Sequence, residues 1–386
     1  MPTAVTTVQP TRTNRREGNN APIATVPFIR ASAEHREPAG IDVTRAMTTS
    51  DQELGVFDIP AFGYVRSIVL LVEASGGVGT GLSAEEDAPW NVLKNIALTE
   101  PNGAVIAQFN TGYDLYLANK WGGYRNSVGA DPKASPVYSP VASSGGGFAF
   151  MLRIPVEINL RDALGSLPNQ NAAATFKLRA TLGSVAQVIA GTVTTPPNVR
   201  VRAYLEAWDQ PEAQTAGQTN QITPPAMNTT QFWSSQTFNV SAGNQTIRLT
   251  RLGNYVRNLI FVLRRGGTDR STGHTDLPDP LTLFLDTRPL DIIERNNILN
   301  QMYERTGFGA KHGTITPGLD TPGGLDSGVF VYDFMHEFDG TLGKENRDLW
   351  LPTLGSTRLE LQGNFGNAGT LTVLTNDVAI AGSVFI

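Results

Sequence analysis

The residues best suited to catalysis or metal binding are thinly spread along this chain. One histidine lies in the acidic segment 333–339, which reads DFMHEFD. On a strand, the three carboxylates of this segment share one face, while the histidine and the two phenylalanines share the other. The segment is compatible with a cation site or with a solvated strand edge, and we favour the strand edge. The four histidines are far apart and lack the spacing of metal ligands: His35, His274, His312 and His336.

Nucleophiles and phosphate-binding loops are equally sparse. The chain has no cysteine, which excludes disulfide bonds, zinc–thiolate sites and cysteine nucleophiles. It has no G-x-S-x-G elbow and no convincing catalytic triad. The glycine-rich stretch 76–81 follows an apolar run, but Leu82 stands where a dinucleotide-binding fingerprint needs its third glycine. We interpret 76–87 as a flexible, then acidic, loop. Glycosidase carboxylates far apart in the sequence remain open, but we predict no enzymatic activity, no metal and no cofactor.

Composition narrows the class of protein. The chain has 386 residues, enough for two domains with ordinary cores. Only 17% of residues are charged, while 39 glycines and 24 prolines suit many short strands joined by turns and loops. A net charge of -5 argues against a sequence-specific nucleic-acid binder. Low surface charge also favours burial by partner subunits. No secretion signal or membrane span is evident, so we expect a soluble protein made in a cytoplasm.

One apolar stretch, 57–77, recurs half a chain later at 247–267. In each copy an arginine precedes a five-residue apolar run, Arg66 before IVLLV and Arg257 before LIFVL, and a glycine pair follows. Short apolar runs bounded by glycine are typical of buried strands, because helices usually need ten or more residues. We expect each arginine to mark the rim, where the strand leaves solvent.

Two further pairs of segments keep the same order and nearly the same offset. Segment 176–183 alternates polar and apolar residues like 358–366, and 152–165 is a weaker match to 330–343. We therefore predict two copies of one all-β domain in tandem. Chance similarity between unrelated strands is the alternative, since strand composition is narrow.

The predicted organisation has four parts. Residues 1–40 are rich in Thr, Pro, Asn and Arg and form an extended N-terminal arm, either a disordered tail or an arm that orders against neighbouring subunits or an acidic surface. The first domain spans 41–210, a linker with almost no large apolar side chain spans 211–231, and the second domain spans 232–386.

Within the domains, a few local signals are clear. Asn102-Gly103 between two apolar runs predicts a hairpin. A short helix is expected at 113–121. A longer helix is expected at 289–305, capped by Asp286 or Thr287, with an imperfect apolar stripe that we assign to packing on a sheet. Its apolar positions are Leu290, Ile293, Leu299, Met302 and Tyr303.

This organisation resembles the double jelly-roll major capsid proteins of tailless icosahedral double-stranded DNA viruses, most closely the tectivirus type. Tandem β-domains, a helix in each copy, long loops and a polar N-terminal arm all contribute to the resemblance. It covers 41–386, and no short diagnostic motif accompanies it. The segments that carry it are 63–77, 253–267, the strands ending at Gly183 and Gly366, and 281–307.

The resemblance implies two eight-stranded jelly rolls per chain, each with two facing sheets. It implies a homotrimer with a pseudo-hexagonal outline, assembled in the host cytoplasm, that tiles the shell of a virion. Loops 123–147 and 307–328 are then candidates for outer towers or the trimer interface. Implied partners are neighbouring capsomers, vertex (penton) and minor capsid proteins, and the lipids of an internal membrane.

The N-terminal arm would face the interior of such a shell. Three arginines, Arg12, Arg15 and Arg16, fit a position beside an anionic lipid surface, where each basic residue gains roughly 1 kcal/mol. The arm has no amphipathic helical period, however, so an extended clamp on neighbouring capsomers is equally compatible with its sequence.

Two other function classes are weighed against the capsid interpretation. A tandem β-sandwich that binds carbohydrate or a receptor, such as a viral spike, should show clustered exposed aromatics, whereas the tryptophans here are scattered. A β-sandwich hydrolase needs convergent carboxylates or a triad, and a pocket with strongly perturbed carboxylates would revive that reading.

Overall fold

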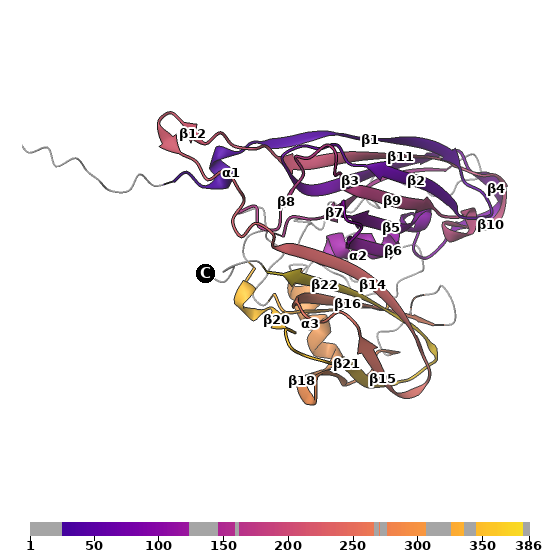
Figure 1. The fold of residues 1–386 in the computed structure, drawn as a ribbon. Helices are drawn as coiled ribbons and strands as arrows, with labels where there is room; N and C mark the ends of the chain where they lie inside the picture. Colours follow the sequence, from indigo (N-terminus) through magenta and orange to yellow (C-terminus); the bar gives the residue numbers. More distant parts are fainter. Residues whose placement is uncertain are drawn as a thin grey trace, which may run out of the picture.

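The computed structural model describes residues 25–122, 146–158, 162–265, 270, 276–305, 326–335 and 345–380. Two β-sandwiches lie side by side (Figure 1). We call them roll 1, with its strands between 34 and 208, and roll 2, with its strands between 230 and 379. Short helices flank or connect the strands: α1 (Phe28–Ala31), α2 (Gly112–Trp121) and α3 (Arg295–Arg305).

Each roll has eight main strands. Those of roll 1 are β1 (Glu34–Ala46), β2 (Gln52–Asp58), β3 (Tyr64–Ser75), β5 (Leu93–Thr99), β6 (Val105–Thr111), β7 (Gly147–Pro155), β9 (Lys177–Leu182) and β11 (Asn198–Trp208). Those of roll 2 are β14 (Thr230–Val240), β15 (Gly243–Leu249), β16 (Tyr255–Arg265), β17 (Leu281–Leu285), β18 (Arg288–Ile293), β19 (Val329–Asp333), β21 (Leu359–Phe365) and β22 (Gly369–Ala379). The shorter strands are β4 (Val78–Ala84), β8 (Leu167–Pro168), β10 (Ile189–Thr195), β12 (Gln214–Thr215), β13 (Gln218–Thr219) and β20 (Leu351–Pro352).

The two rolls share one strand order. One sheet of roll 1 runs β1-β11-β3-β7 and the other β2-β9-β5-β6, while roll 2 runs β14-β22-β16-β19 and β15-β21-β17-β18. Numbered one to eight along each roll, the main strands follow the order 1-8-3-6 and 2-7-4-5 in both. This is the Greek-key arrangement of a jelly roll. The all-β, double jelly-roll prediction is therefore confirmed.

The repeated sequence segments fall on matching strands. The strongest pair lies on β3 and β16, the third strand of each roll, and the others lie on β9 and β21 and on β7 and β19. In both rolls the helix, α2 or α3, follows the fifth strand and precedes the sixth. Each roll also has a two-residue Leu-Pro strand that pairs with the start of its third strand: β8 pairs with β3, and β20 pairs with β16. The two rolls thus match in small details as well as in topology.

Two local expectations are wrong. The helix expected at 289–305 begins only at Arg295, because the preceding residues form β18, which pairs with β17 through a tight turn at Asp286 (φ 54°). The carboxylate of Asp286 does not cap a helix but accepts hydrogen bonds from the backbone of Thr357 and Arg358. Much of the loop expected at 76–87 is strand β4, which pairs with β10.

Other local expectations hold. The hairpin joins β5 to β6, with Gly103 at φ 89° in its turn. The short helix α2 ends at Trp121, next to Gly122. Leu299 and Met302 of α3 are buried.

The strands of roll 1 begin at β1, before residue 41, and β12 and β13 form a small hairpin within the expected linker. The domain boundaries of the sequence analysis stay predictions.

Candidate functional site

The search for a metal site in the described residues finds none. No group of three or more His, Asp or Glu side chains in the described ranges could hold a metal ion. The ring of His35 stacks on Phe62, with centroids 3.9 Å apart, and its Nε2 lies 3.3 Å from Glu37. The other three histidines, and the acidic segment from 336 to 339, lie outside the described residues. No helix within those ranges is long and apolar enough to cross a membrane.

The most extensive buried polar structure is the junction between the two rolls. Strand β6 of roll 1 meets β14 of roll 2 in a parallel bridge between Ala107 and Trp233. This bridge joins one sheet from each roll into a single nine-stranded sheet. Trp233 is fully buried and lies beside Phe109, with ring centroids 6.0 Å apart. The fifth strand of roll 1 and the first strand of roll 2 are therefore edge to edge.

A buried ionic network crosses this junction. Roll 1 contributes Glu86 and Asp87, which follow β4, and roll 2 contributes Arg264 and Arg270. Arg264 Nη2 donates to Asp87 Oδ2 at 2.5 Å, and Arg270 Nε donates to Asp87 Oδ1 at 2.9 Å. The backbone N–H of Arg270 donates to Glu86 Oε2, and its guanidinium also lies 4.8 Å from the ring centre of Tyr113. In this network the acids come from one roll and the bases from the other.

The network holds one more carboxylate than guanidinium. Asp114 of α2 accepts a hydrogen bond from Ser235 Oγ of β14 at 2.8 Å, and burial raises its pKa. Burial also raises the pKa of Glu86 to about 7, although Arg270 opposes the shift. Three acids against two arginines in a buried site favour retention of one proton.

Further polar contacts fix one roll against the other. Lys120 Nζ of α2 donates to Asp326 at 2.7 Å, and Arg347 Nη2 donates to Asp162 at 2.9 Å. Gln231 Nε2 donates to the carbonyls of residues 156 and 157 at 3.1 and 2.9 Å. Such contacts are directional, so together they define one relative orientation of the two rolls.

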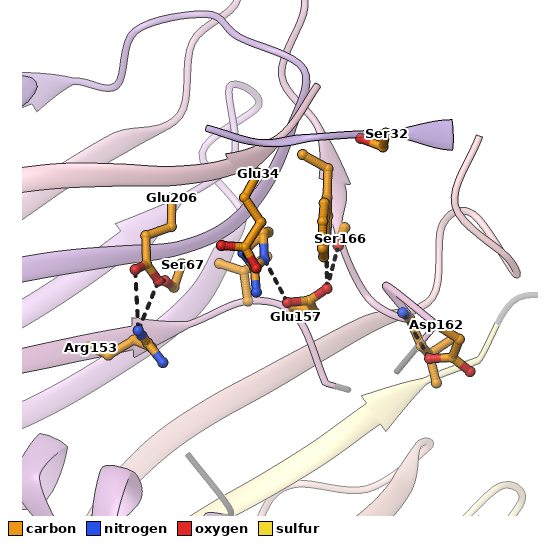
Figure 2. A network of polar contacts seen from close by, with 12 residues as sticks. Ser32, Glu34, Ser67, Arg153, Glu157, Asp162, Ser166 and Glu206 are labelled. Atoms are coloured by element: carbon orange, nitrogen blue, oxygen red, sulfur yellow. Dashed lines mark hydrogen bonds and ion pairs between the residues drawn. The ribbon is translucent and has the colours of Figure 1, made fainter. Parts of the chain in front are cut away.

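A second feature is duplicated, one copy per roll. In roll 1, Arg66 Nε donates to Glu157 at 2.9 Å, Trp208 Nε1 donates to the same carboxylate at 2.7 Å, and the guanidinium lies 4.2 Å from the Trp208 ring centre. Burial raises the pKa of Glu157, against the opposing effect of Arg66. Figure 2 shows Glu157 with Ser166, and nearby Glu206 with Ser67 and Arg153.

In roll 2 the same three residue types meet. Arg257 donates from Nε and Nη2 to the two oxygens of Glu345 at 2.5 and 2.6 Å, and Trp350 Nε1 donates to Glu345 at 2.7 Å. Arg257 Nη1 also donates to the carbonyl of Gly122 in roll 1 at 3.2 Å.

The expectation that Arg66 and Arg257 mark an exposed rim is thus wrong. Their exposed fractions are 6% and 1%. Each sits where the register of its strand slips against the eighth strand, and each is neutralised by a buried glutamate. The sequence signal that the two arginines share a role was their identical placement before an apolar run. Their glutamate partners are distant in sequence, so the sequence did not reveal them.

The predicted arm residues are not placed by the structure. Arg12, Arg15 and Arg16, and nearly all of the loops 123–147 and 307–328, lie outside the described residues. The junction acids were not singled out as functional by sequence, which showed only an acidic stretch after the glycines.

Comparison with known proteins supports the fold. No protein-family model and no curated protein matches the sequence. Solved structures do match over most of the chain. A chain in the atomic structure of Sulfolobus Turreted Icosahedral Virus is 12% identical with a TM-score of 0.61, covering 90% of this chain and 91% of that one.

Two further structures agree. The PBCV-1 virus capsid gives 9% identity and a TM-score of 0.57, covering 91% of this chain and 97% of that one. The major capsid protein of bacteriophage PM2 gives 11% identity and a TM-score of 0.51, covering 92% and 100%. This chain therefore has the double jelly-roll fold found in major capsid proteins of icosahedral viruses.

Proposed function

We propose that this chain is a major capsid protein whose trimers tile the shell of an icosahedral virion. The observation that carries the proposal is the pair of matching jelly rolls held edge to edge in one subunit. Fold alone does not fix function, but the similar structures, which cover 90–92% of this chain, come from viruses and include a major capsid protein, and the described residues offer no metal-binding cluster in competition.

The geometry suits a closed ring. A subunit with two similar rolls placed head to tail has a heterologous contact surface at each end, and such surfaces generate rings when the rotation closes. About 60° per roll closes the ring after six rolls, which is three chains. A pseudo-hexagonal trimer can then fill the hexagonal positions of an icosahedral shell.

Further parts of the proposal rest on sequence. The N-terminal arm, with Arg12, Arg15 and Arg16, faces the interior and contacts neighbouring capsomers or the anionic lipids of an internal membrane. Vertex and minor capsid proteins complete the shell, and assembly takes place in the host cytoplasm.

The binding-module alternative is weakened by burial. A carbohydrate platform commonly uses exposed aromatic rings, but every tryptophan of the chain is buried: Trp90, Trp121, Trp208, Trp233 and Trp350. Trp208 and Trp350 instead donate their indole N–H groups to buried glutamates.

The test is the mass and shape of the purified protein, by light scattering and negative-stain imaging of the same fractions. We expect particles of three times 41.5 kDa with a hexagonal outline. A monomer that persists at high concentration contradicts the proposal, and a glycan array would then be the next experiment.

A further inference from the structure

Three open sheet edges of the described structure are relevant to how one chain meets another. Strand β1 ends one sheet of roll 1, and β18 ends one sheet of roll 2. The corresponding strands at the junction inside the chain are β14, the first strand of roll 2, and β6, the fifth strand of roll 1. Strand β7 is also an edge, but the side chain of Asn119 covers part of it by bonding both the N–H and C=O of Arg153 at 2.7 and 2.6 Å.

We propose that β18 of one subunit lies against β1 of the next, repeating between chains the β6–β14 contact that joins the two rolls within a chain. Inside the chain, a fifth strand meets a first strand. The only other fifth and first strands are β18 and β1, and each has a free edge in the described structure. This inference deepens the proposed capsomer, because it names the surfaces by which the second copy binds.

The position on β1 that replaces Trp233 can be read from the ladders. Trp233 pairs with Asn376, which pairs with the residue just after the bulged Arg257. In roll 1 the residue just after the bulged Arg66 pairs with Glu206, and Glu206 pairs with Arg36. Arg36 therefore occupies on β1 the place of Trp233 on β14. It is exposed, as a residue at a free edge of the isolated subunit should be.

Strand β18 carries the complementary feature. Ile292 is 61% exposed, the highest value among the large apolar side chains that are exposed in the described residues. An apolar side chain on an open edge strand is an aggregation risk unless a partner covers it. The guanidinium of Arg36 is paired with Glu206, at 3.1 Å from Nε, and with Glu34, at 3.7 Å from Nη2. Its long apolar stem can therefore cover an apolar side chain while its charge keeps these partners. A second copy presenting Arg36 fits this requirement.

The absence of cysteine allows a direct test by cross-linking. In the full-length Arg36→Cys/Ile292→Cys double variant, a short bismaleimide should give a covalent ladder that ends at three chains. The single variant Ile292→Cys should give no covalent dimer, because a heterologous contact does not bring two copies of one residue together. The Arg36→Cys/Leu354→Cys variant is the matched control, since Leu354 is 57% exposed but lies near β20.

A second measurement tests how loss of the Ile292 side chain affects trimer formation. Ile292→Asp should raise the dissociation constant of the trimer at least tenfold without changing the circular dichroism of the subunit, and Leu354→Asp should leave it unchanged. Trimers that form without cross-linking in the double variant would overturn this interface but not the capsomer. A covalent dimer from Ile292→Cys alone would replace it with a twofold contact. A protein that stays monomeric would overturn both proposals.

Discussion

Removal of one partner from the buried Arg257–Glu345 pair should destabilise roll 2 far more than removal of both. Arg257→Met deletes the guanidinium that donates to both oxygens of Glu345 at 2.5 and 2.6 Å. Glu345 then keeps only the indole N–H of Trp350 among the hydrogen bonds described above. A buried carboxylate without its cation costs about 3–5 kcal/mol. For a unit of this size that corresponds to a fall of roughly 6–20 °C in the melting temperature.

Arg257→Met/Glu345→Met should recover most of that loss, because two apolar side chains of similar length leave no buried charge. Its residual cost comes from the indole N–H of Trp350, which loses its acceptor, and from the Gly122 carbonyl and Asn376 Oδ1, which lose the donor Nη1 of Arg257. Each buried group left unsatisfied costs about 1–3 kcal/mol. Differential scanning calorimetry of the two single variants and the double variant forms a double-mutant cycle.

The matched control is the Arg200–Asp42 pair. It has the same bidentate geometry, at 2.7 and 2.5 Å, but lies exposed on the surface. Asp42→Asn should leave the melting temperature within error, because solvent screens exposed pairs. If the Arg257→Met and double variants melt at the same temperature, the burial argument is wrong.

Two further predictions concern the junction and the repeated glycines. Because the pKa of Glu86 rises from 4.5 to about 7, the folded state keeps a proton that the unfolded chain loses, and stability should fall as the pH rises from 4.5 to 7. Glu86→Gln should reduce this loss of stability and raise the free energy of unfolding at pH 8 by about 1–2 kcal/mol, after allowance for solvent screening. Urea titrations at pH 5 and pH 8 measure the effect. A variant with the same pH dependence as the unmodified protein would refute the prediction. Gly63→Ala should destabilise more than Gly253→Ala in thermal melts, because both have positive φ but only at Gly63 would a Cβ meet a backbone oxygen, that of Trp208, at 2.0 Å. Equal losses would contradict the steric argument.

The sequence was sufficient for the fold because the fold repeats. The matched apolar runs after Arg66 and Arg257 predicted one buried strand in each domain, and these strands are β3 and β16, the third strand of each roll. The hairpin at Gly103 and the helix at 112–121 followed from local turn and capping chemistry. The helix start at 289 failed, because residues 288–293 carry a helical apolar spacing but are drawn into a ladder with β17. Tertiary pairing overrode a local pattern.

The ion pairs at the junction could not be predicted from the sequence, for a different reason. Glu86 and Arg270 are separated by almost half the chain, and neither lies in a recognisable motif. Their meeting depends on the angle between the rolls, which no local pattern encodes. Arg257 and Glu345 lie 88 residues apart within roll 2, and the burial of the pair inverts the usual expectation that an arginine at a strand end is exposed.

The differences between the two rolls argue that their contacts within and between chains are related but distinct. Arg264, which binds Asp87 across the junction, matches Glu73 on β3, because each lies seven residues after the buried arginine of its strand. Trp233 likewise matches Arg36. The buried junction therefore uses a tryptophan and an arginine where roll 1 carries Arg36 on its edge strand β1 and Glu73 on the interior strand β3. Buried charge is weak evidence of stability, but it penalises a wrong partner strongly. A second copy of roll 1 in the place of roll 2 would set Glu73 of β3 where Arg264 lies, against Asp87, so this charge reversal favours strict alternation of the rolls around a ring.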